Sequence, residues 1–93
     1  MTAYAFVDLT ISNPESFEAY REQAGLALKK HGGTPLHVSK EAEIIEGEGM
    51  APTVSVILTF PDRAAAKAWI EDPEFKHVHD LRRGAGVSNI TLM

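Results

Sequence analysis

The segment from Ala68 to Arg83, AWIEDPEFKHVHDLRR, gathers two histidines, several acids and two arginines beside the only tryptophan of the chain. A histidine such as His79 can act as an acid or a base near neutral pH. An arginine such as Arg82 can hold a carboxylate or enolate oxygen through paired hydrogen bonds. The segment is therefore either part of a binding or catalytic site, or the water-facing side of a helix.

Helical geometry divides this segment into two faces. Pro73 is suited to the first position of a helix. At ~100° per residue, His79 and Arg82 fall on the same side as the apolar Phe75. His77 falls well away from that side, and we expect it to face water. Because two histidines at positions i and i+2 point apart on a helix, we expect no metal site here.

Each candidate residue has a structural and a functional interpretation. Arg82 either anchors a ligand or forms an ion pair with an acid at the edge of the core, such as Glu46. Trp69 is either a core residue or a platform for a ligand. Tyr20 offers its hydroxyl either to a cavity or to the backbone. The candidate ligand-binding residues are therefore Tyr20, Glu46, Trp69, His79 and Arg82.

The first part of the chain predicts a strand followed by a helix. In residues 3–11, AYAFVDLTI, every odd position is apolar, which is typical of a strand with one buried face. Asn13 and Pro14 are suited to begin a helix, and Gly32 and Gly33 are suited to end it. Apolar residues three or four positions apart predict one buried helix face. They are Phe17, Tyr20, Ala24, Ala27 and Leu28.

The middle of the chain is less regular. Residues 34–49, TPLHVSKEAEIIEGEG, predict one or two short strands with a turn or bulge near Lys40 and Glu41. Residues 53–60, TVSVILTF, alternate in character and predict the clearest strand of the sequence. Its apolar face carries valines, a leucine and a phenylalanine.

The last part of the chain completes the fold. Asp62 caps a helix, Asp72 caps a second helical segment, and residues 87–93 read as a final strand. The resulting order is β-α-β-β-α-β with a broken second helix. This order predicts an α+β fold of the ferredoxin-like type, with helices covering one face of an antiparallel sheet.

The uncovered face of this sheet predicts a partner. It would carry Tyr4, Phe6 and Ile57, whereas a sheet face open to water is expected to be polar. Contiguous apolar patches of this kind usually mark an interface. We therefore expect a homodimer in which two copies stack these faces about a two-fold axis.

Length, charge and composition exclude several classes of protein. With 93 residues the chain is expected to form one domain over residues 1–93. The net charge of −4 and the absence of a clustered basic face argue against nucleic-acid binding. No apolar run approaches the ~20 residues of a membrane helix, and the N-terminus lacks a basic leader. Because the chain also has no cysteine, we expect a cytoplasmic protein.

Several motifs together resemble a known family. They are NPESFEAY, HGG, IIEGEG, LTFPDRAAAKAWIEDPEF and the late Arg82, and they are similar to the family called domain of unknown function 1330. The resemblance covers almost the whole chain and implies a dimeric α+β barrel, in which ferredoxin-like protomers pair their sheets. The candidate residues that match the family pattern are Tyr20, Glu46, Trp69 and Arg82.

The chain also departs from that pattern at polar positions. Val38 stands where the family usually has an arginine, and Thr59 stands where it tends to have a glutamate. These departures imply either a more apolar ligand or no ligand. Proteins of the wider barrel group include cofactor-free monooxygenases, haem-dependent enzymes and small-molecule sensors. We expect no cofactor in this chain, because no histidine is placed as an axial haem ligand and there is no C-x-x-C-H motif.

Three functions remain open on the sequence alone. The first is binding of a small organic acid or polyketide-like ligand in a pocket between sheet and helices. The second is a cofactor-free enzyme of monooxygenase, isomerase or cyclase type that uses the same pocket. The third is a purely structural dimer whose cavity is filled by side chains.

Overall fold

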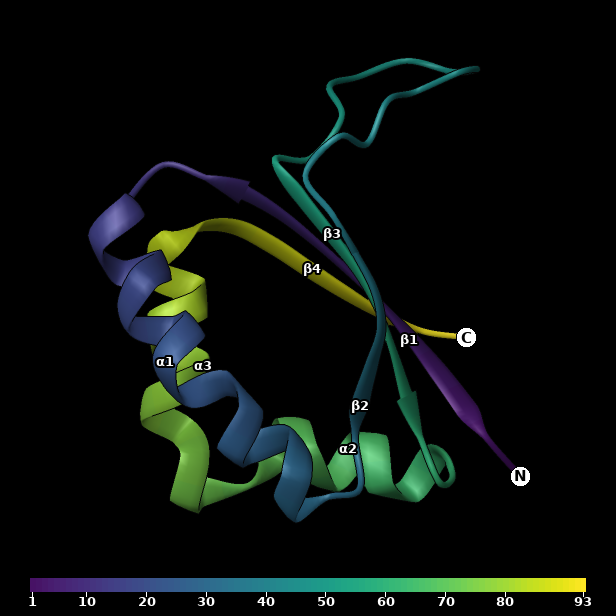
Figure 1. Ribbon diagram of the computed structural model, residues 1–93, viewed down its shortest axis with the longest axis vertical. Coiled ribbons are helices and arrows are strands. Elements are labelled where there is room, and N and C mark those ends of the chain that lie inside the picture. Colours follow the sequence, from purple (N-terminus) through teal and green to yellow (C-terminus); the bar gives the residue numbers. More distant parts are fainter.

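The computed structural model describes residues 1–93 and contains one four-stranded antiparallel sheet with all helices on one of its faces (Figure 1). The strand order is β2-β3-β1-β4, which is the ferredoxin-like arrangement that the sequence predicts. The elements are β1 (Ala3–Ile11), α1 (Pro14–Lys30), β2 (Thr34–Ser39), β3 (Val54–Phe60), α2 (Arg63–Glu71), η1 (Pro73–Phe75), α3 (Lys76–Ala85) and β4 (Gly86–Leu92).

Strand β1 lies in the centre of the sheet and sets its two faces. Its odd residues from Ala3 to Leu9 are buried against the helices, as the alternating pattern predicts. Ala5 lies opposite Leu58 of β3 and Leu92 of β4, so the apolar residues of three strands meet on that face.

The opposite face of the sheet has no helix over it. It carries Tyr4 and Phe6 from β1, and Ile57 from β3, which pairs with Phe6. Strand β4 adds Val87 and Thr91 to this open face. Tyr4 is 43% exposed and Val87 is 67% exposed, so apolar and aromatic groups on this face meet water in the single chain.

Helices α1 and α2 begin at the capping residues that the sequence indicates. The side chain of Asn13 accepts a hydrogen bond from Ser16 N at 3.3 Å, and that of Asp62 accepts one from Ala65 N at 2.7 Å. Asp72 accepts from Glu74 N at 2.9 Å, but it caps only the short 3-10 turn η1 and not the α-helix that we expected there. Helix α3 begins at Lys76 without a side-chain cap. None of the helices combines the length and the apolar character needed to cross a lipid bilayer.

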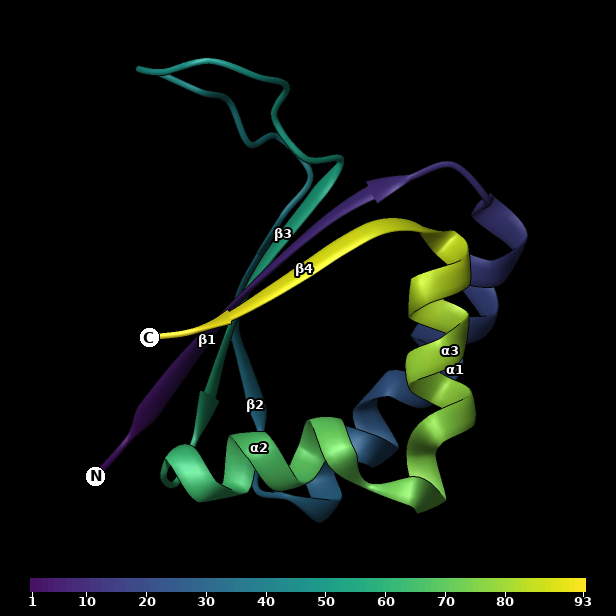
Figure 2. The ribbon, with the colours of Figure 1, turned by 180° about the vertical axis from the view of Figure 1, so that it is seen from behind.

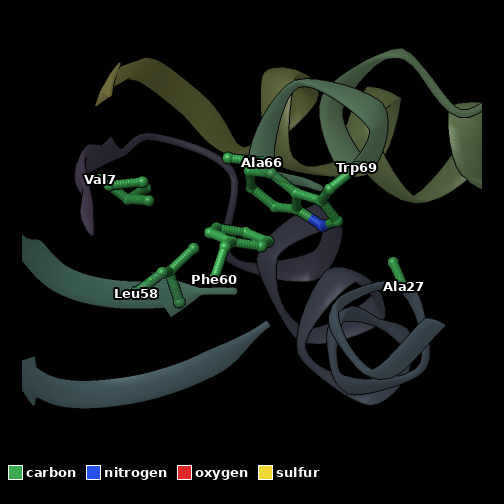
Figure 3. Packing of buried hydrophobic residues seen from close by; sticks show 7 residues of the cluster. Val7, Ala27, Leu58, Phe60, Ala66 and Trp69 are labelled. Atoms are coloured by element: carbon green, nitrogen blue, oxygen red, sulfur yellow. The ribbon is translucent and has the colours of Figure 1, made fainter. Parts of the chain in front are cut away.

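The core is built around Trp69 of α2. Its ring centroid lies 5.4 Å from that of Phe60, and both side chains are almost fully buried (Figure 3). Ala66, one turn earlier in α2, packs beside them. Helices α1 and α3 lie side by side (Figure 2). Ser16 of α1 donates a hydrogen bond to the Leu81 carbonyl of α3 at 2.7 Å.

One glycine allows two strands to meet. A Cβ atom on Gly86, the first residue of β4, would lie 1.9 Å from the carbonyl oxygen of Thr10 in β1. No side chain fits at this distance, so the turn from α3 into β4 requires glycine.

The connection between β2 and β3 differs from the sequence-based expectation. A second short strand at AEIIEG, residues 42–47, was one of the two alternatives, but residues 40–53 contain no strand and extend away from the body (Figure 1). Of the turn or bulge expected near Lys40, the structure has the turn, because β2 ends at Ser39 and the chain bends at Lys40. The bulge in β2 lies instead between Pro35 and His37. An apolar run forms a strand only where a neighbouring strand accepts its backbone hydrogen bonds, and none lies beside this one.

Candidate functional site

A pocket of about 420 Å³ lies between the sheet and helix α1, with α3 at one end. This volume is in the range of small-molecule sites. Its apolar walls come from the helix-facing residues of three strands and from the inner face of α1. They are Val7, Leu9, Phe17, Ala24, Leu28, Pro35, Val38, Val54, Val56 and Leu58. The polar side chains that reach it are Tyr20, Arg21, Lys40 and Arg82.

Arg82 is the buried cation of this pocket. Only 3% of the residue is exposed. Its Nη1 donates a hydrogen bond to Nδ1 of His79 at 2.6 Å, and its Nε donates to the hydroxyl of Ser88 at 3.2 Å. These two bonds fix the guanidinium and leave further N–H groups available as donors.

His79 holds Arg82 in place and is itself held by the backbone. Its Nε2 lies 2.8 Å from the carbonyl oxygen of Trp69. Because Nδ1 accepts from Arg82, the proton of the neutral ring is on Nε2, which donates to that carbonyl. Burial lowers the pKa of His79, and the hydrogen bond to the Trp69 carbonyl opposes this shift. His79 is therefore a neutral positioning residue with both nitrogens occupied.

No carboxylate neutralises Arg82. The ion pairs of the structure involve other residues, so the pair with Glu46 that we considered does not form. Instead, the guanidinium lies 5.9 Å from the ring centroid of Tyr20 and 5.8 Å from that of Trp69. Burial lowers the pKa of Arg82, and the neighbouring Tyr20 opposes this shift. The guanidinium remains charged at neutral pH, so the pocket ends in an uncompensated positive charge.

The structure brings four of the five candidate residues together. Tyr20 and Arg82 line the pocket, and His79 contacts Arg82 from behind. Trp69 packs edge-on against His79 with ring centroids 5.0 Å apart, but it borders a separate, smaller depression. Glu46 lies in the exposed segment between β2 and β3, outside the pocket of its own chain.

Most residues that line the pocket were not among the candidates, and three of them affect its shape or charge. Gly25 lies in the middle of α1, and a Cβ atom added there would meet nothing within 4 Å. Because Gly25 has no side chain, the space beside this turn of α1 stays part of the pocket. Lys40 adds positive charge to the pocket, whereas the guanidinium of Arg21 is paired with Glu18 at 2.9 Å. The only sequence signal for Gly25 was its cost inside a helix, which suggests a reason other than helix stability.

A second charged cluster links the C-terminal end of α1 to Asp72, which follows α2, and lies outside the pocket. The carboxylate of Asp72 accepts from Lys30 at 2.7 Å and from His31 at 2.7 Å, both at the C-terminal end of α1. The hydrogen bond from Lys30, followed by that from His31, holds the pKa of Asp72 well below its usual range. His31 thus has a structural partner in addition to its favourable position at a helix end.

The sequence matches one family model over nearly its whole length. Residues 2–93 match the family described as domain of unknown function (DUF1330). No curated protein matches the chain.

Solved structures with the same fold include proteins of unknown function and an oxygenase. A protein of unknown function from Rhodopseudomonas palustris, RPA0582, has a TM-score of 0.76 at 19% identity and covers 99% of this chain and 80% of its own. SnoaB, a cofactor-independent oxygenase from Streptomyces nogalater, has a TM-score of 0.71 at 15% identity, covering 99% and 90%. A dimeric ferredoxin-like protein of unknown function from Jannaschia sp. CCS1 has a TM-score of 0.71 at 17% identity, covering 100% and 98%. At these identities the similarity shows a shared fold.

Proposed function

The chain belongs to the DUF1330 family, and on this premise we propose that it is a homodimeric α+β barrel protein that binds a small organic anion in the pocket beside Arg82. The ligand is an apolar, ring-containing acid or enol whose oxygen lies against the guanidinium. The single observation that carries this proposal is the buried Arg82 charge without a carboxylate partner.

The energetic argument rests on the cost of a buried charge. Taking a charged group out of water costs several kcal/mol, which an opposite charge and hydrogen bonds offset. Arg82 has hydrogen bonds and aromatic neighbours but no anion. A carboxylate or enolate at this end of the pocket would supply the missing charge through charge-assisted hydrogen bonds. The apolar walls would bury the rest of the ligand, in agreement with Val38 standing where the family usually has an arginine.

Binding is better supported than catalysis by His79. A general base needs a free nitrogen near the proton that it removes, and both nitrogens of His79 already have partners in the chain. The enzyme alternative therefore depends on Tyr20 and Arg82, which could stabilise an enolate as it forms. We retain this alternative because the chain shares its fold with the oxygenase SnoaB. The third alternative, a structural dimer with a filled cavity, is disfavoured by the volume of the pocket.

The dimer is supported by the open face of the sheet. Phe6 and Ile57 lie side by side at its centre, and no helix covers them. A second copy would remove these groups from water. The Jannaschia protein of the same fold is described as dimeric.

The proposal can be tested with a pair of matched ligands. We expect 1-hydroxy-2-naphthoate, an aromatic acid, to bind more tightly than the neutral 1-naphthol in isothermal titration calorimetry. Arg82→Met keeps much of the volume of the side chain and removes its charge, so the acid should lose about tenfold or more in affinity while 1-naphthol changes little. Arg83→Met is the control, because Arg83 is exposed and pairs with Asp80. Equal affinity of wild type and Arg82→Met for the acid would contradict the proposal.

A further inference from the structure

Residues 40–53, which we call the arm, connect β2 to β3 and extend away from the rest of the chain (Figures 1 and 2). The tip of the arm carries large apolar side chains in water. Ile45 is 91% exposed and Met50 is 90% exposed. Gly47 and Gly49 have positive φ values of 106° and 103°, so the chain reverses direction between these side chains.

The arm has almost no partner in its own chain. Its hydrogen bonds lie at its two ends, from Glu41 N to the hydroxyl of Ser39 and from Ile11 N to the hydroxyl of Thr53. Apart from those in the helices and strands, no backbone hydrogen bond involves residues 40–53. Backbone groups and apolar side chains that extend without internal partners indicate a surface that another molecule covers.

The net charge of the arm indicates the charge of the surface that covers it. The arm holds four glutamates and one lysine, and thus three of the four net negative charges of the chain. Such an arm is repelled by anionic lipid and attracted to a positive surface. The edge of the pocket offers Lys40, which forms no ion pair within the chain, whereas Arg21 is already paired with Glu18.

Symmetry connects the arm to this surface. The arm leaves the body at the pocket itself, because Val38 and Lys40 are pocket residues. In a two-fold dimer, contacts between the two copies are reciprocal. If two arms cross about the axis, the tip of each arm lies beside the base of the other, which is the edge of a pocket. The glutamates of one tip then meet Lys40 of the other copy.

We propose that the arm of a second copy of this chain closes the pocket, with Glu46 of one copy paired with Lys40 of the other and with Ile45 against the apolar edge. The site of each copy is then incomplete without its partner. This inference rests on the proposed function, since it assigns the lid of the same pocket. It also brings Glu46 of the second copy to the pocket, whereas Glu46 of the same chain lies outside it.

A charge-swap experiment tests the contact. A homodimer of the Lys40→Glu variant has two glutamates at each arm contact, and a homodimer of the Glu46→Lys variant has two lysines there. Because like charges repel, each variant homodimer should dissociate more readily than the wild-type dimer. Mixed, they form a heterodimer in which both contacts pair opposite charges. We expect native mass spectrometry, with a tag on one variant, to find more heterodimer than random exchange gives. A contact within one chain would not respond to mixing.

The control pair is Lys40→Glu mixed with Glu71→Lys. Glu71 is an exposed residue at the end of α2. Helix α2 lies at the opposite end of the molecule from the arm (Figure 1). No heterodimer preference is expected for this mixture. A preference equal to that of the Glu46→Lys mixture, or no preference in either, overturns the proposal.

Shortening the arm tests its role as a lid. Replacing residues 42–50 by two glycines removes no core contact, so the fold should persist by circular dichroism. We expect the affinity for 1-hydroxy-2-naphthoate to fall at least fivefold. Unchanged affinity in the shortened protein overturns the lid while leaving the pocket proposal intact. Absence of binding by the wild-type protein counts against the proposed function, and the charge-swap result still decides the arm contact.

Discussion

His79 and Arg82, one turn apart on α3, share a 2.6 Å hydrogen bond in which the guanidinium donates to Nδ1 of the imidazole. The bond exists only while His79 is neutral, because a protonated imidazole has no acceptor. The opposite nitrogen donates to the Trp69 carbonyl, so the orientation of the only buried guanidinium depends on the protonation state of its neighbour.

This relationship predicts how stability changes with pH. The pKa of His79 is lower in the folded protein than its ordinary value of 6.5, so the unfolded chain binds the proton more tightly. The contribution of His79 to stability is therefore complete above about pH 6.5 and is lost as the pH falls toward the lowered value. Urea unfolding between pH 7.5 and pH 5 should show a steeper loss for wild type than for His79→Gln. The exposed residue His77 provides the control, since His77→Gln should follow wild type. Equal slopes for all three proteins would contradict the prediction.

Gly25 predicts opposite effects on stability and on binding. Gly25→Ala should stabilise the protein by about 0.5–1 kcal/mol, because alanine favours the helix and its methyl group meets no atom. Gly25→Leu starts from the same free Cβ position, and we expect its longer side chain to extend into the pocket. It should reduce binding of 1-hydroxy-2-naphthoate by at least about tenfold without loss of stability. Thermal unfolding and calorimetry on the two variants measure both effects, and equal ligand affinity of the two would show that the ligand lies elsewhere.

The open sheet face predicts a variant that separates the dimer. Ile57→Lys places a charge at the centre of the proposed interface, where it would be buried without a partner, and should weaken the dimer by about tenfold or more. Sedimentation velocity at micromolar concentration measures this. Leu26→Lys is the control, because Leu26 is 63% exposed on α1 and lies on the helical side of the molecule. A wild-type protein that sediments as a monomer would remove the basis of the prediction.

Gly86 predicts a large loss of stability. In Gly86→Ala the new Cβ would overlap the Thr10 carbonyl oxygen, so β1 and the start of β4 must separate. We expect a loss on the order of 3 kcal/mol, which is typical of strain at a special backbone position. Urea unfolding measures the loss, and Gly25→Ala is a comparison of opposite sign. If Gly86→Ala leaves the free energy of unfolding unchanged, β1 and β4 can separate at this point with little loss of stability.

Local patterns in the sequence were sufficient to predict most of the fold. The alternation of residues 3–11 and the caps at Asn13 and Asp62 depend on neighbours along the chain, and the structure confirms them. Helical periodicity also predicted that His79 and Arg82 lie on the apolar face of their segment, where both are buried, and His77 is exposed as predicted. These features are encoded within a few residues of each other.

Features that depend on distant neighbours were not predictable. The run AEIIEG resembles a strand, but no other strand lies beside it, so it becomes part of the arm. The pocket exists because α1 stands away from β2 and β3, and the sequence of α1 does not show this separation. The partner of His79 is a carbonyl at Trp69, on the far side of the break between α2 and α3.

The position of the only tryptophan gives the protein an optical reporter at its own site. The indole ring of Trp69 touches the imidazole of His79 edge-on and lies 5.8 Å from the guanidinium of Arg82. Indole fluorescence responds to nearby charge, so all of the tryptophan emission of this chain comes from beside the charged end of the pocket. Occupancy of the pocket and protonation of the imidazole can therefore be followed in the unmodified protein without attaching a dye.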